Sequence, residues 1–334
     1  MNWFKQLTGF EETDAGTVRS KLELSGEYLV SKVNGRKMRC GNLEIPSLAE
    51  LRTQTQGIAP GGRITVNEVI GDVAEYHRDP ANANALFQAA SQFNLLEMVS
   101  PAVTPEAGIT GYEDDHTQGP ACAIACGAGT IYRQYFVAVN KRPGQTADNQ
   151  IDCLSELAHY LDNDRHNYWA VRNGYAFPTE DGIDRLTKTI NASSPEEREQ
   201  LLSRLQIGLQ WNTEVTTSGD HHSVSQAYCS ALPVLYSSIA PARWEAFARL
   251  VLEAAYEATF HAALLNRKRT GSNKLFLTLV GGGVFGNKDE WIGEAVLRSI
   301  RMFAHHDLDV KFISYGGSSE LVGRIILTYR LASL

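Results

Sequence analysis

The chain has 334 residues, of which 43% are hydrophobic and 21% are charged, and its formal net charge is -7. A chain of this length and composition can bury a sizeable core in one large domain or two ordinary ones. Proteins that bind nucleic acid usually carry a basic surface, so the acidic balance argues against nucleic acid as a partner. No apolar run is long enough to span a bilayer, which argues against a membrane protein.

The cysteines and the N-terminus indicate a reducing, cytoplasmic location. Five cysteines form an odd and sparse set that suits free thiols better than a disulfide framework. The N-terminal stretch "MNWFKQLTGFEETD" turns acidic too early for a signal peptide. We therefore expect an intracellular protein with free thiols.

The first part of the chain reads mostly as β-structure. Residues 20–46 alternate in polarity, and Asn34-Gly35 favours a hairpin. Residues 62–73 indicate a strand that ends in a turn, whereas residues 83–98 suit either a helix or a strand. Residues 120–139 begin like a helix of small residues and end like a strand.

Helices are predicted in the second half. Ser194 is expected to cap a helix, with Pro195 as the first helical residue and Glu197 as its capping-box partner. A second helical region covers about 241–266. After it, a strand at 275–280, a helix and another strand alternate, which is typical of an α/β fold with parallel strands.

The stretch "LFLTLVGGGVFGNKDEWIGEAV", residues 275–296, predicts a phosphate site between a strand and a helix. Glycines let the backbone approach a ligand closely, and the first helical turn offers unpaired N–H groups. Asn287 is the expected N-cap of that helix, and Asp289 lies in its first turn.

Two familiar glycine motifs fit this loop poorly. Gly281 to Gly286 spell the dinucleotide fingerprint G-x-G-x-x-G, but the next strand ends in Tyr315 rather than in a ribose-binding acid. No Gly-Lys-Ser/Thr closes the loop, which excludes a P-loop. The remaining alternative is a tight turn that only permits close packing.

Three stretches in this order resemble macrodomains, which bind ADP-ribose. Gly71-Asp72 follows a strand, "VGGGVFGN" is similar to the macrodomain phosphate loop, and residues 108–136 lie where the catalytic loop and its helix are found. The order of these parts resembles the MavL-like group of ADP-ribosylhydrolases and, more distantly, poly(ADP-ribose) glycohydrolases, over roughly 62–320. The macrodomain Asn-Ala-Ala-Asn loop and the glycohydrolase Gln-Glu-Glu signature are both absent.

The resemblance implies a set of ADP-ribose-binding residues. Asp72 would contact the adenine amine, Phe93 would stack on a ring, and Asn94 would bond a ribose hydroxyl. Purely structural roles are the alternatives: a turn cap for Asp72, a core position for Phe93 and a turn for Asn94. The ligand is further expected to contact Gln118, Gly119, Ser223, Val224, Gly281, Gly282, Gly283, Val284, Phe285, Gly286 and Asn287.

Four carboxylates compete for the catalytic role. Splitting a glycosidic bond builds positive charge on the ribose, which a carboxylate can stabilise, or a carboxylate can activate the attacking water. The cluster Glu113, Asp114 and Asp115 precedes a helix of small residues, and Asp115 is preferred. Asp289 is a rival, because it follows the glycine loop directly. Simple solvated charges and helix-dipole complements are the alternatives.

We therefore predict an α/β fold of macrodomain type, with a mixed, largely parallel sheet flanked by helices. Residues 1–61 are expected to form an N-terminal β-rich extension, and residues 62–334 the ADP-ribose-binding domain with a helical insertion at about 150–266. The resemblance implies a hydrolase that removes ADP-ribose from a protein, on arginine and with ubiquitin as one example of a substrate. It would need no cofactor and no metal. A non-catalytic reader of ADP-ribose is the alternative.

Overall fold

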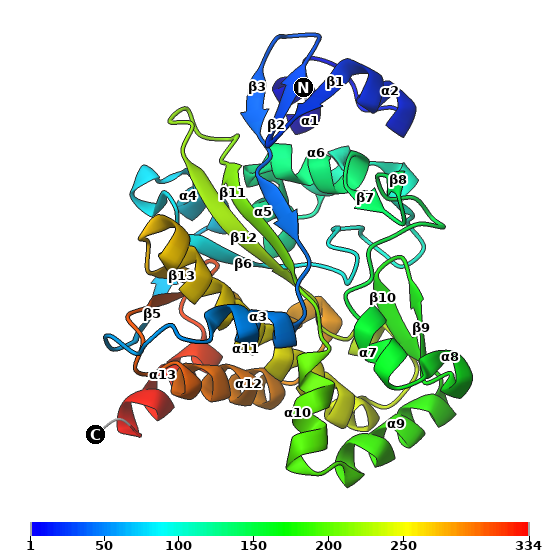
Figure 1. Cartoon of the computed structure of the whole chain (residues 1–334), viewed down its shortest axis with the longest axis vertical. Helices are drawn as coiled ribbons and strands as arrows, with labels where there is room; N and C mark the ends of the chain where they lie inside the picture. The colour runs from blue at the N-terminus through cyan, green and yellow to red at the C-terminus, as the bar shows by residue number, and fades with distance from the viewer. Residues whose placement is uncertain (1, 333–334) are drawn as a thin grey trace.

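A seven-stranded sheet organises the computed structural model, which describes residues 2–332 (Figure 1). The strand order is β4-β11-β12-β6-β13-β14-β5. Neighbours are parallel from β12 through to β5, and antiparallel between β12, β11 and β4. The strands are β4 (Asn42–Glu44), β5 (Thr65–Ile70), β6 (Leu86–Ala90), β11 (Gly208–Glu214), β12 (Ser223–Cys229), β13 (Lys274–Leu277) and β14 (Asp309–Ser314). The expected mixed, largely parallel sheet is confirmed.

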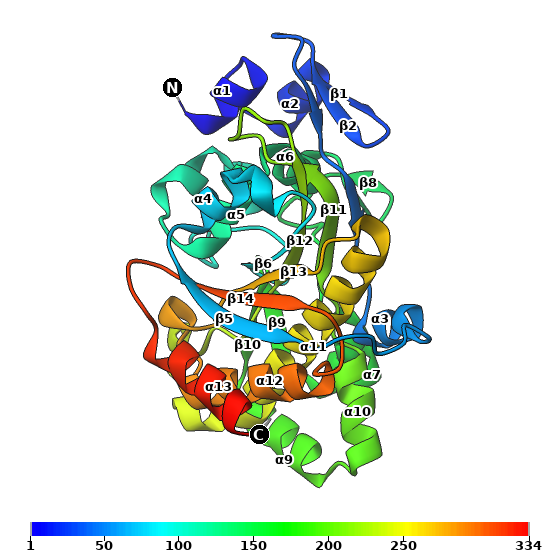
Figure 2. The ribbon, with the colours of Figure 1, turned by 90° about the vertical axis from the view of Figure 1, so that its left-hand side faces the viewer.

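Helices cover both faces of this sheet, as Figure 2 shows. One layer holds α4 (Val73–Arg78), α5 (Gln118–Ala125) and α6 (Gly127–Tyr135). The other holds α3 (Leu48–Thr55), α11 (Glu245–Thr270), α12 (Asp289–Met302) and α13 (Glu320–Leu331). Successive side chains of a strand point to opposite faces. Accordingly, Phe87 stacks on His77 of α4, whereas Gln88 donates to Thr259 of α11.

The central strands are buried on both faces, and this settles the ambiguous segment 83–98. Leu86, Phe87 and Gln88 of β6 are all buried, as expected of a parallel strand between two helical layers. Strand β6 pairs with a neighbour on each side and is five residues long, and an irregular loop follows it. Segment 83–98 is therefore a strand and a loop.

The N-terminal extension is a mixture of helices and strands. The predicted hairpin around Asn34-Gly35 is confirmed, because β2 pairs antiparallel with β3. The extension packs on α6 through a small core that includes Phe4, Leu29 and Met38. Its elements are α1 (Trp3–Thr8), α2 (Ala15–Lys21), β1 (Leu22–Ser25), β2 (Tyr28–Ser31) and β3 (Lys37–Arg39), seen at the top of Figure 1.

The expected helical insertion at about 150–266 is only partly helical. Besides α11 it contains α7 (Ser155–Tyr160), α8 (Asn163–His166), β9 (Trp169–Arg172), β10 (Tyr175–Pro178), α9 (Glu180–Ala192) and α10 (Pro195–Ser203). It also supplies β11 and β12 to the central sheet, so a helical insertion over the whole range is wrong. The capping box of Ser194 and Glu197 at α10 is confirmed.

The remaining elements are short. They are β7 (Ala138–Val139), β8 (Arg142–Pro143) and the 3-10 turns η1 (Pro80–Asn82), η2 (Pro105–Ala107), η3 (Thr110–Asp114), η4 (Val234–Tyr236), η5 (Pro241–Trp244) and η6 (Gly283–Phe285). None of the helices within residues 2–332 combines the length and apolar character that crossing a bilayer requires.

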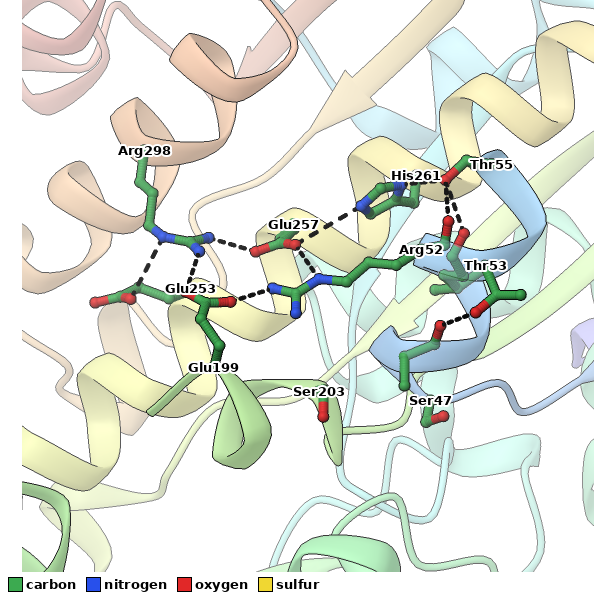
Figure 3. Close-up of polar contacts among 12 residues, drawn as sticks. Ser47, Arg52, Thr53, Thr55, Glu199, Ser203, Glu253, Glu257, His261 and Arg298 are labelled. Carbon is green, nitrogen blue, oxygen red and sulfur yellow. Dashed lines mark hydrogen bonds and ion pairs between the residues drawn. The ribbon is translucent and has the colours of Figure 1, made fainter. Parts of the chain in front are cut away.

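A buried ion-pair network joins α3, α10, α11 and α12 (Figure 3). Its centre is Glu257 on α11, whose side chain is 1% exposed. Arg52 donates to it at 2.6 Å and Arg298 at 2.5 Å. Burial alone would raise the pKa of Glu257, but hydrogen bonds from His261, Arg52 and Arg298 lower it to about 2. Glu257 is therefore an ionised, fully paired carboxylate that fixes these helices together.

Candidate active-site cleft

A cleft opens at the carboxyl ends of the parallel strands, where open α/β sheets commonly bind ligands. It has two lobes of about 420 Å³ and 690 Å³, a size that suits a small organic ligand. We call them the Glu97 lobe and the Asp72 lobe, after the carboxylate that lines each. The residues that line both lobes are Asp115, Thr117, Gln118, Thr278 and Leu279.

The glycine loop after β13 forms one wall of the Glu97 lobe. Gly281, Gly282, Gly283, Val284 and Phe285 all line it. Gly281 has φ +81°, and a Cβ there would lie 2.4 Å from the Cβ of Ala231. Only glycine fits such a backbone without strain. Consecutive left-handed and extended glycines form a concave backbone of the kind that binds anions.

The loop is held from two sides. Tyr256 of α11 donates its hydroxyl hydrogen to the Thr278 carbonyl and accepts from the amide of Val280. Asn287 donates its side-chain amide to the carbonyls of Leu232 at 2.8 Å and Gly281 at 3.1 Å. The expectation that Asn287 caps the next helix is wrong, because Lys288 occupies the N-cap position. Asn287 instead lies buried beneath the loop.

Glu97 lies in the loop after β6 and was not among the predicted site residues. Its backbone amide donates to the Tyr112 hydroxyl at 2.9 Å. The amide of Met98 donates to the side chain of Gln92, and the amide of Gln92 donates to the Leu96 carbonyl. The backbone that carries Glu97 is therefore fixed on several sides.

The carboxyl group of Glu97, by contrast, has no such partners. Glu97 is 7% exposed, and its Oε1 has no hydrogen-bond partner within residues 2–332. Burial raises the pKa of Glu97 well above its ordinary value, with Asp115 adding to the rise and Arg133 opposing it. Strongly raised carboxyl pKa values in a cleft are a mark of catalytic acids. Burial thus favours the protonated form of the Glu97 carboxyl.

Helix α5 packs its N-terminus directly against Glu97. A Cβ at Gly119 would lie 2.4 Å from Oε2 of Glu97 and 2.1 Å from the Ala90 carbonyl oxygen. Gln118 ties the same turn to β6, since it accepts from the Ala90 amide and donates to the Gln88 carbonyl. Both predicted residues therefore line the cleft, and each also has a packing role.

The predicted acidic cluster is divided by the fold. Asp115 lines both lobes, and its Oδ1 accepts from the Thr117 amide at 2.9 Å. Glu113 lines the Asp72 lobe and accepts from the backbone amide of Trp3. Asp114 is exposed and lines neither lobe. Of the three, Asp115 alone reaches the junction of the two lobes.

Asp72 lies in the second lobe and also caps α4. Its Oδ1 accepts from the Ala74 amide at 2.8 Å, so the capping alternative describes one of its oxygens. The other oxygen has no hydrogen-bond partner in the part of the chain that the structure describes. Tyr315, which is 82% exposed, lines the same lobe. This lobe thus offers a free carboxylate oxygen beside an unpacked aromatic ring.

The remaining predicted residues lie away from both lobes. Phe93 is 2% exposed in the main core, and Asn94 is fully buried, bonding Gln150 and the amide of Leu96. Ser223 and Val224 begin strand β12 and so lie at its amino end, opposite the cleft. Asp289 pairs with Arg324 on the surface, and Gly286 packs against Leu235.

Comparisons with known proteins add fold-level likeness only. No protein-family model matches the chain, and no curated protein sequence matches it. One similar solved structure is poly(ADP-ribose) glycohydrolase from Deinococcus radiodurans in complex with ADP-ribose. It is 11% identical, with a TM-score of 0.46 over 88% of this chain and 95% of that one. Another is poly(ADP-ribose) glycohydrolase from Thermomonospora curvata bound to the inhibitor ADP-HPD. It is 12% identical, with a TM-score of 0.44 over 94% of this chain and 97% of that one. Likeness at this level transfers no residue roles, so the roles proposed below come from the geometry of the cleft.

Proposed function

We propose that the protein is an ADP-ribosylhydrolase that works in this cleft. The observation that carries the proposal is Glu97, a buried carboxylic acid without a hydrogen-bond partner for Oε1, in a lobe walled by the glycine loop. The glycine loop would hold the diphosphate, and Asp72 in the adjoining lobe would bond the adenine amine. The ribose that carries the scissile bond would then lie beside Glu97 and Asp115.

The chemistry follows from the charge states of these two acids. Glu97, whose raised pKa favours the protonated form, gives its proton to the departing atom of the modified side chain. A water molecule adds its oxygen to the anomeric carbon as that bond breaks, and its proton passes to Asp115. The Asp115 carboxyl would also favour the positive charge that builds on the ribose. The products are ADP-ribose and the unmodified side chain, and the scheme uses no cofactor.

We further propose that the substrate is an ADP-ribosylated protein, as the resemblance to MavL-like macrodomain hydrolases implies. Arginine is the proposed attachment site, with modified ubiquitin as one substrate to test. Asp115 and Glu113 add acidic side chains to the cleft, which supports this proposal, because they favour a cationic guanidinium over an acidic side chain.

Two assays test the proposal in sequence. Calorimetry with free ADP-ribose should detect binding, and Asp72→Ala should weaken it about tenfold or more. The protein should then release ADP-ribose from an arginine-modified protein. Binding without any release from arginine-, serine- or glutamate-linked substrates would favour a non-catalytic reader. Absence of both binding and release would overturn the proposal.

A further inference from the structure

A buried arginine lies behind the loop that carries Glu97. Arg133 of α6 is 1% exposed, and its Nε donates to the Leu95 carbonyl at 3.2 Å. The other partners of its guanidinium group are neutral: Thr130, Gln210 and the ring of Tyr228, whose centroid lies 3.8 Å from the guanidinium carbon. No carboxylate oxygen among residues 2–332 forms an ion pair with it within 4.0 Å.

A buried charge without an ionic partner destabilises the fold, because its removal from water costs several kcal/mol. The turn that Arg133 holds is itself strained. Leu95 adopts a left-handed φ of +64°, which costs roughly 1–3 kcal/mol for a residue other than glycine. Its side chain fills the space above Gly208, where a Cβ would lie 2.4 Å from it. Strain of this kind persists where the surroundings impose it, and Glu97 is only two residues further along.

We propose that Arg133 is a positioning residue for Glu97. It clamps the strained turn that presents the carboxyl group to the cleft, through the hydrogen bond from its Nε to the Leu95 carbonyl. The role of Glu97 in hydrolysis rests on the function proposed above, but the clamp and the charge do not. Five other ionisable groups interact electrostatically with Glu97. They are Tyr112 of η3, Asp115 directly after η3, Cys122 of α5, Tyr175 of β10 and Tyr228 of β12.

Because Arg133 opposes the rise in the pKa of Glu97, its removal should raise that pKa further. Arg133→Met removes both the clamp and the charge, whereas Arg133→Lys keeps the charge and loses the planar donor fork. The Glu97 carboxyl can be titrated by NMR in protein labelled at glutamate, with Glu97→Gln identifying its resonance. This readout needs no turnover, so it remains informative even if the proposed hydrolysis fails.

We expect Arg133→Met to titrate Glu97 at higher pH than the wild type, and Arg133→Lys to titrate it close to the wild-type pH. If the chain is the proposed hydrolase, both variants should lose about 10- to 100-fold in kcat with little change in KM. In the Met variant the alkaline limb of the pH profile should also move to higher pH. Arg165→Met, a change at an exposed arginine, should alter none of these values.

A measurement on the unmodified Arg133 guards against a variant that fails to fold. In the wild-type chain, the Arg133 Nε–H resonance should shift with the same midpoint as the Glu97 carboxyl, and it should stay constant in Glu97→Gln. An unchanged Glu97 titration in folded Arg133→Met would overturn the proposal. So would an Arg133 resonance that is insensitive to Glu97 in the wild-type chain.

Discussion

Two buried glutamates, one on α11 and one in the cleft, have pKa values that shift in opposite directions. Glu257 is 1% exposed and receives hydrogen bonds from two arginines, so its pKa falls to about 2 (Figure 3). Glu97 is 7% exposed, and its Oε1 has no partner within residues 2–332, so its pKa rises. Both side chains are buried, so the difference in their hydrogen-bond partners accounts for the opposite directions of the two pKa shifts.

The two glutamates therefore have different roles: Glu257 stabilises the fold, and Glu97 serves the proposed reaction. The paired carboxylate of Glu257 joins four helices, and both of its oxygens already accept hydrogen bonds from arginines. An unpaired acid in the cleft destabilises the fold, yet it holds a proton that it can transfer. Proteins accept such local costs at functional sites. The four predictions below test this separation, beginning with the largest expected effect.

Asp115→Asn should lower the rate of ADP-ribose release by about 10²- to 10⁴-fold, since the general base is lost. Its thermal stability should stay close to that of the wild type. The matched control is Asp79→Asn, because Asp79 also accepts from the amide two residues ahead but lies outside the cleft. Release measured under single-turnover conditions checks the prediction, and equal rates in the two variants would contradict it.

Glu257→Gln should lower the free energy of unfolding by about 3 kcal/mol, because it leaves two half-buried arginines without full compensation. The activity of each folded molecule should be unchanged. Since the folded pKa of Glu257 is depressed, its stabilisation is present above the unfolded value near pH 4.5 and is lost as pH falls towards 2. Urea unfolding between pH 7 and pH 3 should show this loss in the wild type and much less of it in the variant. An unchanged unfolding midpoint at pH 7 would contradict the stabilising role.

Gly281→Ala should weaken ADP-ribose binding by about 10- to 100-fold, because a methyl group forces the glycine loop out of its left-handed turn. Gly271→Ala is the matched control. Gly271 has φ +83° and open space around it at the end of α11, so this change should cost stability but not affinity. Calorimetry with ADP-ribose distinguishes the two, and equal affinities would show that the loop does not hold the ligand.

Glu97→Gln should stabilise the fold by about 1–3 kcal/mol at neutral pH, since it removes the penalty for a buried carboxyl. A raised folded pKa means that the wild type loses stability as pH rises above the unfolded pKa of 4.5. The advantage of the variant should therefore be small near pH 4 and grow towards pH 7. Thermal unfolding across that range checks the trend, and a variant less stable than the wild type at pH 7 would argue that Glu97 is paired.

Local sequence patterns predicted what local physics determines. The glycine loop, the hairpin at Asn34-Gly35 and the capping box at Ser194 depend on residues within a few positions of each other. The buried strand predicted at 275–280 was likewise visible as an apolar run before the glycines. These features therefore followed from the sequence without knowledge of the fold.

Distant contacts determine the rest. Glu97 stands in the apolar run "NLLEMV", and a lone acid there is a signal, but its meaning depends on Tyr112 and Gly119 from another segment. Asn287 resembles an N-cap in sequence, yet the Leu232 carbonyl 55 positions away determines its role. Ser223 and Val224 were expected at the ligand, whereas pairing with β6 and β11 places them at the amino end of β12, away from the cleft.

The most direct test of the account is the release of ADP-ribose from an arginine-modified protein by the wild type and by Glu97→Gln. Both should bind free ADP-ribose with similar affinity. The wild type should release ADP-ribose, and the variant should be slower by about 10²- to 10⁴-fold. Release by Glu97→Gln at the wild-type rate would contradict the central role of Glu97 in this cleft.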